Sequence, residues 1–267
     1  MSNIEIGVLG GSGFYNLLEN AQEKTIQTEY GDPSDKVVVG EYAGKSVAFL
    51  PRHGQDHNFP PHLVPYRANL ATFKKLGVKY IIGPCAAGSL QVGVKPGEFV
   101  ILDQFVDRTK SRKDTIFEGP KGRVAHLPMN EPYCSNLRKL AIDCCQELDI
   151  QVHQTGTVVV IEGPRFSTVA ESRWFSSQGW EVINMTQYPE CYLAREMGMC
   201  YVGIALITDH DVGLEGHSEV KSVTMEDVIK VFNENNEKVK KLIFRMIEKL
   251  EIQECGCHSS AQKAIVQ

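Results

Sequence analysis

The stretch VGIALITDHDVG, which runs from Val202 to Gly213, constrains the fold of this chain more than any other feature. Its first half, Val202–Ile207, is an apolar run typical of a buried strand, and it ends abruptly in the polar sequence TDHD at residues 208–211. Open α/β sheets bind ligands beyond the carboxyl ends of their strands. There an acid can be shielded by the core and keep its proton near neutral pH. The alternative is a structural role, in which Asp209 and Asp211 cap a helix or form an Asx turn.

The length and composition suit one α/β domain. The chain has 267 residues, of which 42% are hydrophobic, and this is enough for a sizeable core. The sequence contains no internal repeat, low-complexity segment or Pro/Gly-rich linker. We therefore expect a single domain over residues 1–250. A polar C-terminal tail over residues 251–267 is expected to be mobile or docked on a partner.

Charge and hydropathy exclude several classes of partner. The formal net charge is -5, and the sequence contains no basic patch dense enough to neutralise a row of phosphates, so no nucleic-acid partner is expected. No apolar stretch reaches membrane-spanning length, so no membrane partner is expected either. The first residues lack the basic segment and long apolar run of a secretory signal. These features predict a cytoplasmic protein.

Eight cysteines are many for such a chain, but their spacing is not that of a zinc site. No CxxC motif occurs, and the isolated Cys255-Gly256-Cys257 lacks a second ligand pair. A mobile tail is therefore favoured over a redox role for this pair, and no metal site is predicted. Cys144 falls on the apolar face of a helix predicted over residues 135–148, which favours a place in the core.

Two further strand ends carry groups suited to an anion. The run Ile4–Leu9 leads into the sequence GGSG, whose backbone N–H groups and Ser12 hydroxyl can surround an oxyanion. This turn is neither a dinucleotide fingerprint nor a Walker loop. The run Val47–Leu50 leads into Arg52 and His53, and a guanidinium fork suits phosphate oxygens. A plain tight turn and an ordinary surface Arg–His pair are the structural alternatives.

Three more apolar runs, Tyr80–Gly83, Val158–Ile161 and Val182–Ile183, lead into small or polar residues in the same manner. Together the six strand ends supply oxyanion donors, an aromatic and thioether wall, and an acid pair. The members of these three groups are Ser12, Arg52, His53 and Thr186; Phe166 and Met185; and Asp209 and Asp211. This set fits a small anion beside a flat heterocycle. No nucleophilic Ser or Cys is visibly paired with a base.

Helices are predicted between these strands. One is expected from Leu63 to Leu76, where Gly77 closes it. Another begins at Thr168, and Glu171 three residues later completes a capping box. A long helix is expected from a cap at Thr224 to about residue 250.

The motifs GGSG, PRHG, CAAGS, IEGPRFST, INMT followed by PE, and TDHD occur in this order along the chain. In this order they resemble the trimeric purine nucleoside phosphorylase family over residues 4–250, and most of all its members that act on methylthioadenosine. The resemblance implies an α/β single domain with a central mixed β-sheet flanked by helices. It also implies a homotrimer or dimer of trimers, and inorganic phosphate as a co-substrate with no cofactor. From cysteine-bearing thermophilic members it further implies two disulfides, Cys134–Cys200 and Cys255–Cys257.

The implied reaction is phosphorolysis of S-methyl-5′-thioadenosine to adenine and 5-methylthioribose 1-phosphate, a step of purine and methionine salvage. The resemblance assigns phosphate binding to six residues: Ser12, Arg52, His53, Cys85, Ala86 and Thr186. It places the nucleoside against Ala87, Gly88, Phe166, Ser167, Ile183, Asn184, Met185, Thr208, Asp209, His210, Asp211, Met225, Val228 and Ile229, with His126 reaching in from a neighbouring subunit. Cys85 stands where Thr or Asn is more usual, and a thiol is a poor donor, so its contact is expected through the backbone.

The residues point to the same chemistry. Glycosidic cleavage passes through an oxocarbenium-like state, which a bound phosphate stabilises while it is held as the nucleophile. Asp209 is the candidate proton donor to the leaving base, with Asp211 raising its pKa. A carboxylate accepts from a 6-amino group, whereas relatives that prefer 6-oxopurines carry Asn in this motif. The alternatives are a 6-oxopurine nucleoside or methylthioinosine phosphorylase, a phosphate-independent nucleosidase, and a non-catalytic purine-binding module.

Overall fold

A computed structural model of the chain describes residues 4–10, 18–118, 123–218, 220 and 225–266, without the side chains of residues 225–230 and 232. Ser12 lies outside the described residues, as do the side chains of Met225, Val228 and Ile229. The expected cap at Thr224 lies outside them too.

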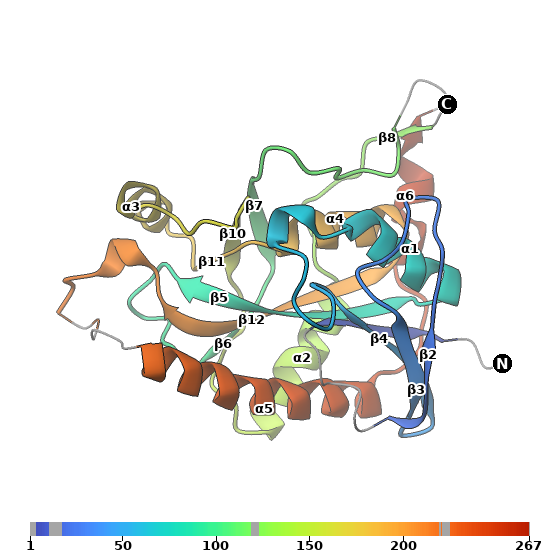
Figure 1. The fold of residues 1–267 in the computed structure, drawn as a ribbon, viewed down its shortest axis with the longest axis horizontal. Helices are drawn as coiled ribbons and strands as arrows, with labels where there is room; N and C mark the ends of the chain where they lie inside the picture. Colours follow the sequence, from blue (N-terminus) through green and yellow to red (C-terminus); the bar gives the residue numbers. More distant parts are fainter. Residues whose placement is uncertain (1–3, 11–17, 119–122, 219, 221–224, 267) are drawn as a thin grey trace.

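One mixed sheet forms the centre of the molecule, with helices on both faces (Figure 1). Its central strand is β5 (Tyr80–Ser89), which pairs in parallel with β1 (Ile6–Gly10) and β12 (Cys200–His210) and antiparallel with β11 (Val182–Asn184). The other strands of this sheet in the described chain are β2 (Glu19–Lys24), β3 (Val37–Tyr42), β4 (Lys45–Pro51), β6 (Phe99–Ile101), β7 (Gln104–Arg108), β9 (Val152–His153) and β10 (Thr157–Ile161). The expected α/β single-domain fold with a mixed sheet is confirmed.

Helices pack on both faces of the sheet (Figure 1). Helices α1 (Tyr66–Leu76) and α4 (Gln187–Glu196) pack on one face, and α2 (Ser135–Glu147) and α5 (Met225–Lys249) pack on the other. Because successive side chains of a strand point to opposite faces, neighbouring strand residues enter different cores. Leu9 packs with the α1 side, for example, and Val8 with the α5 side. Cys144 is fully buried in the core under α2, as expected.

Local signals in the sequence account for several element boundaries. Ala43 and Gly44 both have positive φ, at 50° and 74°, as the tight turn between the antiparallel strands β3 and β4 requires. Helix α1 ends at Gly77 with φ 91°, which closes its last turn. Helix α3 (Val169–Ser177) begins with the predicted capping box between Thr168 and Glu171. Strand β5, in contrast, continues to Ser89 instead of ending at Gly83, because β11 and β12 flank its second half.

The polar C-terminal tail folds onto the chain's own body, unlike the mobile or partner-docked segment expected. It forms helix α6 (Cys257–Ala264), which packs against α4, and strand β13 (Ile265–Val266), which pairs with β8 (Val124–Ala125). In α6, the side chains of Cys257 and Ala261 are buried. Figure 1 shows the C-terminus beside β8.

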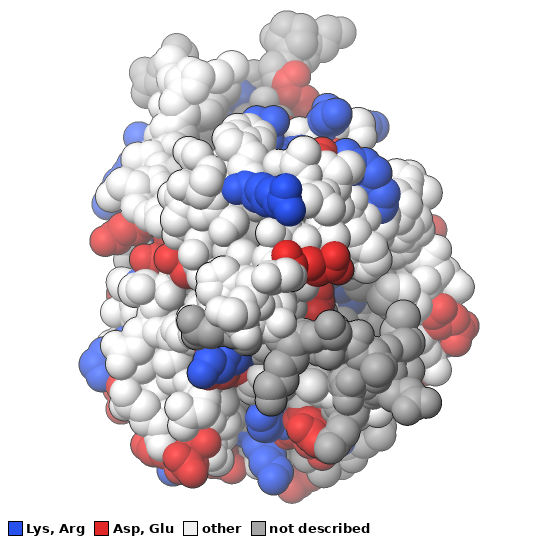
Figure 2. All heavy atoms as spheres, turned by 90° about the vertical axis from the view of Figure 1, so that its left-hand side faces the viewer, with Lys and Arg blue, Asp and Glu red and all other residues white. Residues whose placement is uncertain are grey.

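The face shown in Figure 2 carries charged side chains of both signs. On the face shown in Figure 2, Lys and Arg alternate with Asp and Glu among uncharged residues, and the described residues there form no continuous basic patch. Of the helices in the described part of the chain, none combines the length and the apolar character needed to cross a bilayer.

Candidate active site

A cavity of about 1010 Å³ opens where β1, β4, β5, β11 and β12 end or bend, beside the connection from β10 to α3. It brings together residues from every strand end singled out in the sequence that the structure describes. The predicted site residues that line it are Arg52, His53, Cys85, Ala86, Ala87, Gly88, Phe166, Ser167, Ile183, Asn184, Met185, Thr186, Thr208, Asp209 and Asp211. Arg52 and Asp209 therefore share one cavity, as the proposed chemistry requires.

Two predicted residues lie elsewhere in this chain. His210 does not line the cavity, and its Nε2 atom is buried without a hydrogen-bond partner among the described residues. His126 follows β8, where its backbone N–H donates to the Ala264 carbonyl at 3.1 Å. The cavity of its own chain does not include it.

The cavity also contains residues that sequence reasoning missed. From α5 it includes Asn233, Asn236, Glu237 and Lys240, and from the segment after β4 it includes Gly54, Gln55, His57 and Pro61. The apolar stripe of α5 marks its core face and says nothing of the polar face beside it. The segment after Arg52 could have been predicted as part of the site, because it follows a strand end and contains two histidines.

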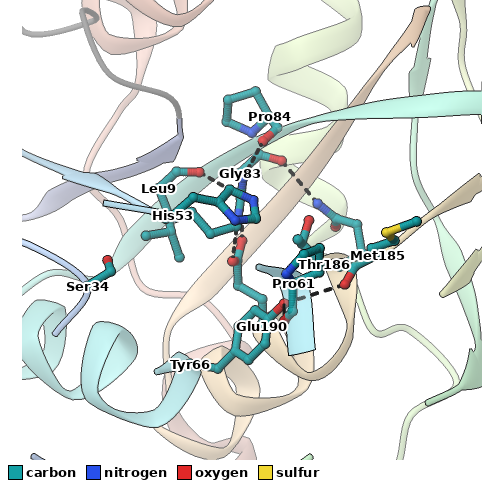
Figure 3. Close-up of polar contacts among 12 residues, drawn as sticks. Leu9, Ser34, His53, Pro61, Tyr66, Gly83, Pro84, Met185, Thr186 and Glu190 are labelled. Atoms are coloured by element: carbon teal, nitrogen blue, oxygen red, sulfur yellow. Dashed lines mark hydrogen bonds and ion pairs between the residues drawn. The ribbon is translucent and has the colours of Figure 1, made fainter. Parts of the chain in front are cut away.

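The Arg52 guanidinium makes four hydrogen bonds to Leu9, Pro84 and Glu190, and these three partners are labelled in Figure 3. Its Nε and Nη2 donate to the two oxygens of Glu190 at 2.6 and 2.7 Å, and Nη2 also donates to the Leu9 carbonyl at 2.7 Å. Nη1 donates to the Pro84 carbonyl at 3.0 Å. A guanidinium carries five N–H groups, so one on Nη1 makes no hydrogen bond to any residue that the structure describes. Arg52 thus presents a fixed positive charge with one N–H group to spare.

Glu190 is the main positioning partner of Arg52, and nothing in its local sequence had suggested this. Its side chain is fully buried, and it also accepts a hydrogen bond from the Tyr201 hydroxyl. A Cβ on Gly83 would lie 1.9 Å from that hydroxyl, so glycine there makes room for Tyr201. Burial disfavours the Arg52 charge, but the Glu190 carboxylate outweighs burial and raises the pKa of Arg52. Arg52 therefore keeps its positive charge.

His53 stands beside Arg52 as a neutral ring. Burial is the first cause that lowers its pKa, to about 4, and the Arg52 charge adds to the effect. Its Nδ1 lies 2.8 Å from the Phe59 carbonyl, which can only accept, so Nδ1 carries the proton. The Nε2 atom of the neutral ring is then an acceptor. His53 is suited to receive a hydrogen bond from a protonated anion.

The acid pair owes its placement to an irregularity in β12. The register between β12 and β5 shifts between Ile207 and Asp209, so Thr208 is the extra residue of a β-bulge. A bulge re-aims the side chains beyond it. Consequently Thr208 and Asp209, which strict alternation would place on opposite faces, both line the cavity.

The two carboxyl groups lie above Gly88 in different surroundings. A Cβ on Gly88 would lie 3.7 Å from an oxygen of Asp209 and 3.7 Å from the Asp211 Cβ. Asp209 accepts from the Thr208 hydroxyl at 2.6 Å, and Asp211 accepts from the Ser167 hydroxyl at 2.7 Å. Burial raises the pKa of Asp209; the Thr208 bond opposes this, and the Asp211 charge adds to it. Asp209 is the group of the pair that is prepared to hold a proton.

The remaining walls differ in polarity. The Phe166 side chain is 80% exposed, so its ring is free to stack on a flat ligand. Burial raises the pKa of the Cys85 thiol to about 11, which keeps it neutral. Cys85 is therefore no thiolate nucleophile, and an anion would meet an uncharged side chain there.

All eight cysteines lie within the described chain and are free thiols, so neither of the two implied disulfides is present. Sequence spacing alone indicates no second ligand pair beside Cys255 and Cys257. The structure supplies one, because folding brings Cys134 and Cys200 to the same place. This cluster lies apart from the cavity lining.

Comparisons with known proteins agree with this geometry. Residues 5–248 match the family described as the phosphorylase superfamily. A curated relative, S-methyl-5′-thioadenosine phosphorylase of Pyrococcus horikoshii, is 50% identical over 254 residues, which are 95% of this chain and 96% of the relative. The protein of the same name from Saccharolobus solfataricus is 47% identical over 268 residues, covering 98% of this chain and 97% of that protein.

Solved structures show the same likeness. A methylthioadenosine phosphorylase from an antarctic soil metagenomic library superposes with a TM-score of 0.93 at 39% identity, covering 99% of this chain and 93% of that chain. A mutant adenosine/methylthioadenosine phosphorylase of Schistosoma mansoni, in complex with methylthioadenosine, has a TM-score of 0.90 at 31% identity. That likeness covers 98% of this chain and 99% of the other.

Proposed function

This chain belongs to the phosphorylase superfamily, and we propose that it is a pentosyltransferase that cleaves S-methyl-5′-thioadenosine with inorganic phosphate. The products are adenine and 5-methylthioribose 1-phosphate, so the enzyme serves purine and methionine salvage. One observation carries the proposal: the cavity contains both a fixed cation, Arg52, and an acid with a raised pKa, Asp209. Phosphorolysis of a nucleoside needs these two groups on either side of the bond that breaks.

Phosphate binds at the Arg52 end of the cavity in this proposal. The spare Nη1–H group of Arg52 donates to one phosphate oxygen, and the Nε2 atom of His53 accepts from a protonated one. The Thr186 hydroxyl and the backbone of Cys85 and Ala86 complete the oxyanion site, and Ser12 joins it from the turn after β1. The fixed guanidinium is already oriented before phosphate binds, which reduces the free energy lost in ordering the site.

The nucleoside lies between phosphate and the acid pair. Phe166 and Met185 form the apolar wall for the purine and ribose, and Ile183, Asn184 and Ser167 border the base. The polar groups of β12 face the purine edge from across Gly88. The methylthio group extends toward α5, where the assigned residues are Met225, Val228 and Ile229.

The reaction proceeds as the glycosidic bond lengthens and positive charge builds up on the ribose ring. The phosphate anion stabilises that charge and then bonds to the anomeric carbon. The electrons of the broken bond pass to the purine, whose imidazole nitrogen takes the proton of Asp209. Asp211 accepts a hydrogen bond from the Ser167 hydroxyl, and its charge raises the proton affinity of Asp209. Phosphate as co-substrate supplies the nucleophile, and the mechanism uses no further cofactor.

Product analysis tests the proposal directly. Methylthioadenosine incubated with enzyme and phosphate is expected to yield adenine and a sugar 1-phosphate in equal amounts, and no adenine without phosphate. Liquid chromatography of the base and phosphorus NMR of the sugar measure the two products. Adenine release independent of phosphate would identify a nucleosidase instead. Binding without turnover would identify a purine-binding module.

A second candidate function is a 6-oxopurine nucleoside or methylthioinosine phosphorylase. The same phosphate site serves it, so only the base distinguishes the two. The TDHD sequence favours adenine, because a carboxyl oxygen at position 209 or 211 can accept from its 6-amino group. Comparing kcat/KM for methylthioadenosine and inosine decides between them.

The rate is expected to fall as the pH rises through the pKa of Asp209, because only the protonated carboxyl can donate. The raised pKa also means that the folded state binds this proton more tightly than the unfolded chain does. This contribution to stability is therefore present at low pH and lost as the pH rises through the folded-state pKa. A pH profile of kcat at saturating phosphate measures the effect. A rate that climbs steadily across the range would contradict the assignment.

We further propose that the chain acts in the cytoplasm as a homotrimer, or as a dimer of trimers. His126 lies outside the cavity of its own chain, beside the exposed Val124 of β8, which leaves it available to a neighbouring subunit's cavity. Eight free thiols suit a reducing compartment. The mass in solution tests the assembly, and a monomer that is fully active would contradict it.

A further inference from the structure

Four cysteines from distant parts of the chain meet outside the active-site cavity. Cys134 precedes the first turn of α2, Cys200 begins β12, and Cys255 and Cys257 lie in the C-terminal tail. Their four sulfur atoms all lie within 4.8 Å of one another. We propose that Cys134, Cys200, Cys255 and Cys257 bind one zinc ion, which fixes the C-terminal tail to the body of the enzyme.

The geometry is that of a tetrahedral site. Zinc–sulfur bonds of about 2.3 Å in a tetrahedron place the sulfur atoms about 3.8 Å apart. The Sγ atoms of Cys134 and Cys255 are 3.8 Å apart, and the other pairs lie within the 4.8 Å limit. Small rotations of the side chains bring all four sulfurs to ligand distance of one central ion.

Two polar side chains beside the cluster, Arg195 and His258, lie within hydrogen-bond reach of its sulfur atoms. The Arg195 Nη1 donates to the Cys257 sulfur at 2.8 Å. The His258 Nδ1 accepts from the Cys255 backbone N–H at 3.4 Å, so its Nε2 carries the proton and faces the Cys200 sulfur at 3.6 Å. A zinc ion with four thiolates has a net charge of −2, and donors of this kind stabilise it. They would contribute little to the uncharged sulfurs of a disulfide.

The site is closed to bulk water yet reachable by an ion. Three of the four cysteines are buried, and Cys255 is half-buried. A cavity of about 280 Å³ reaches Cys134, Cys200 and Cys255 between α2 and the end of α5. With four protein ligands and no open position, such a zinc ion is structural and takes no part in the reaction.

The consequence concerns the tail. Beyond Cys257, helix α6 packs on α4, and β13 pairs with β8, directly before His126. Without zinc, the tail keeps these contacts but loses its covalent anchor to α2 and β12. We expect loss of the ion to lower thermal stability and to leave the chemistry at Asp209 intact.

The test uses the full-length chain purified without reductant and without chelator. Mass spectrometry of the metal content is expected to find one zinc per chain. Replacement by cobalt is expected to give the visible absorption bands of tetrahedral cobalt thiolate. The Cys255→Ala variant is expected to lose the metal and the bands. The matched control Cys145→Ala, which changes a buried cysteine outside the cluster, is expected to keep both.

Thiol counting separates zinc from disulfides, and it needs no variant to fold. After denaturation with chelator and without reductant, the zinc site leaves all eight thiols free to react. Fewer than eight would show disulfides and overturn the proposal. Eight reactive thiols with no zinc in the purified chain, and none taken up from added zinc, would overturn it as well.

Discussion

The Asp209→Asn variant is expected to lose about 10²- to 10⁴-fold in kcat/KM for methylthioadenosine, the range of general acid catalysis. The amide preserves the size of the side chain but has no acidic proton for the leaving base. It can also donate a hydrogen bond, which a 6-oxo group accepts and a 6-amino group does not. The preference should therefore shift toward methylthioinosine and inosine. Steady-state rates on the four nucleosides, adenosine included, measure both effects.

A substrate that needs no acid provides the control for this prediction. In a 5-methylthioribose derivative that carries a nitrophenol, the leaving group departs as the stable nitrophenolate anion. Asp209→Asn should therefore lower the rate of cleavage of this substrate only slightly. An equal loss with both leaving groups would show that Asp209 only positions the substrate. Unchanged selectivity for adenine in this variant would contradict its role in choosing the base.

The second large effect is expected at the buried ion pair. Glu190→Gln should destabilise the protein by about 3–5 kcal/mol, since it leaves the Arg52 charge buried with no counter-ion. One oxygen of the carboxylate becomes an amide group that faces a guanidinium donor. Arg52 then loses its orientation, and KM for phosphate should rise more than KM for the nucleoside. Urea denaturation and initial rates at varied phosphate measure the two effects.

An exposed ion pair in the same chain provides the comparison. Glu147 binds Arg245 at 3.0 Å, and also Lys249, on the surface between α2 and α5, and it is not among the residues that line the cavity. Glu147→Gln should change stability by about 0–1 kcal/mol, as exposed pairs do, and leave both KM values unchanged. If the two substitutions had equal effects, Glu190 would be an ordinary structural residue.

Much of the site could be predicted because its residues share one local signal. An apolar run followed at once by polar residues predicts a strand end, and strand ends gather at the edge of a sheet. Arg52 and Asp209 both carry this signal, and both line the cavity. The α/β fold followed from the same runs.

The features of the structure that could not be predicted depend on contacts between residues far apart in the sequence. Nothing beside Glu190 in the sequence indicates that it binds Arg52. The two side chains meet only because α4 packs Glu190 against Arg52, which is 138 positions away in the chain. Thr208 shows no sign in sequence of being the extra residue of a bulge. The cysteine cluster joins residues as far apart as Cys134 and Cys257, which no spacing rule connects. In each case tertiary packing decides what local propensity leaves open.

Strand β5 has an implication for how far this enzyme could diverge. Its stretch from Cys85 to Gly88 links the end of the cavity with Arg52 to the end with Asp209, and neighbouring strands hold it along its length. At about 3.3 Å per residue, the backbone from Cys85 to Gly88 spans about 10 Å and sets the separation of the two ends of the cavity. Changes in the surrounding loops can alter which base or which 5′ substituent is accepted. The spacing on which bond cleavage depends stays the same, so new specificities could arise without new chemistry.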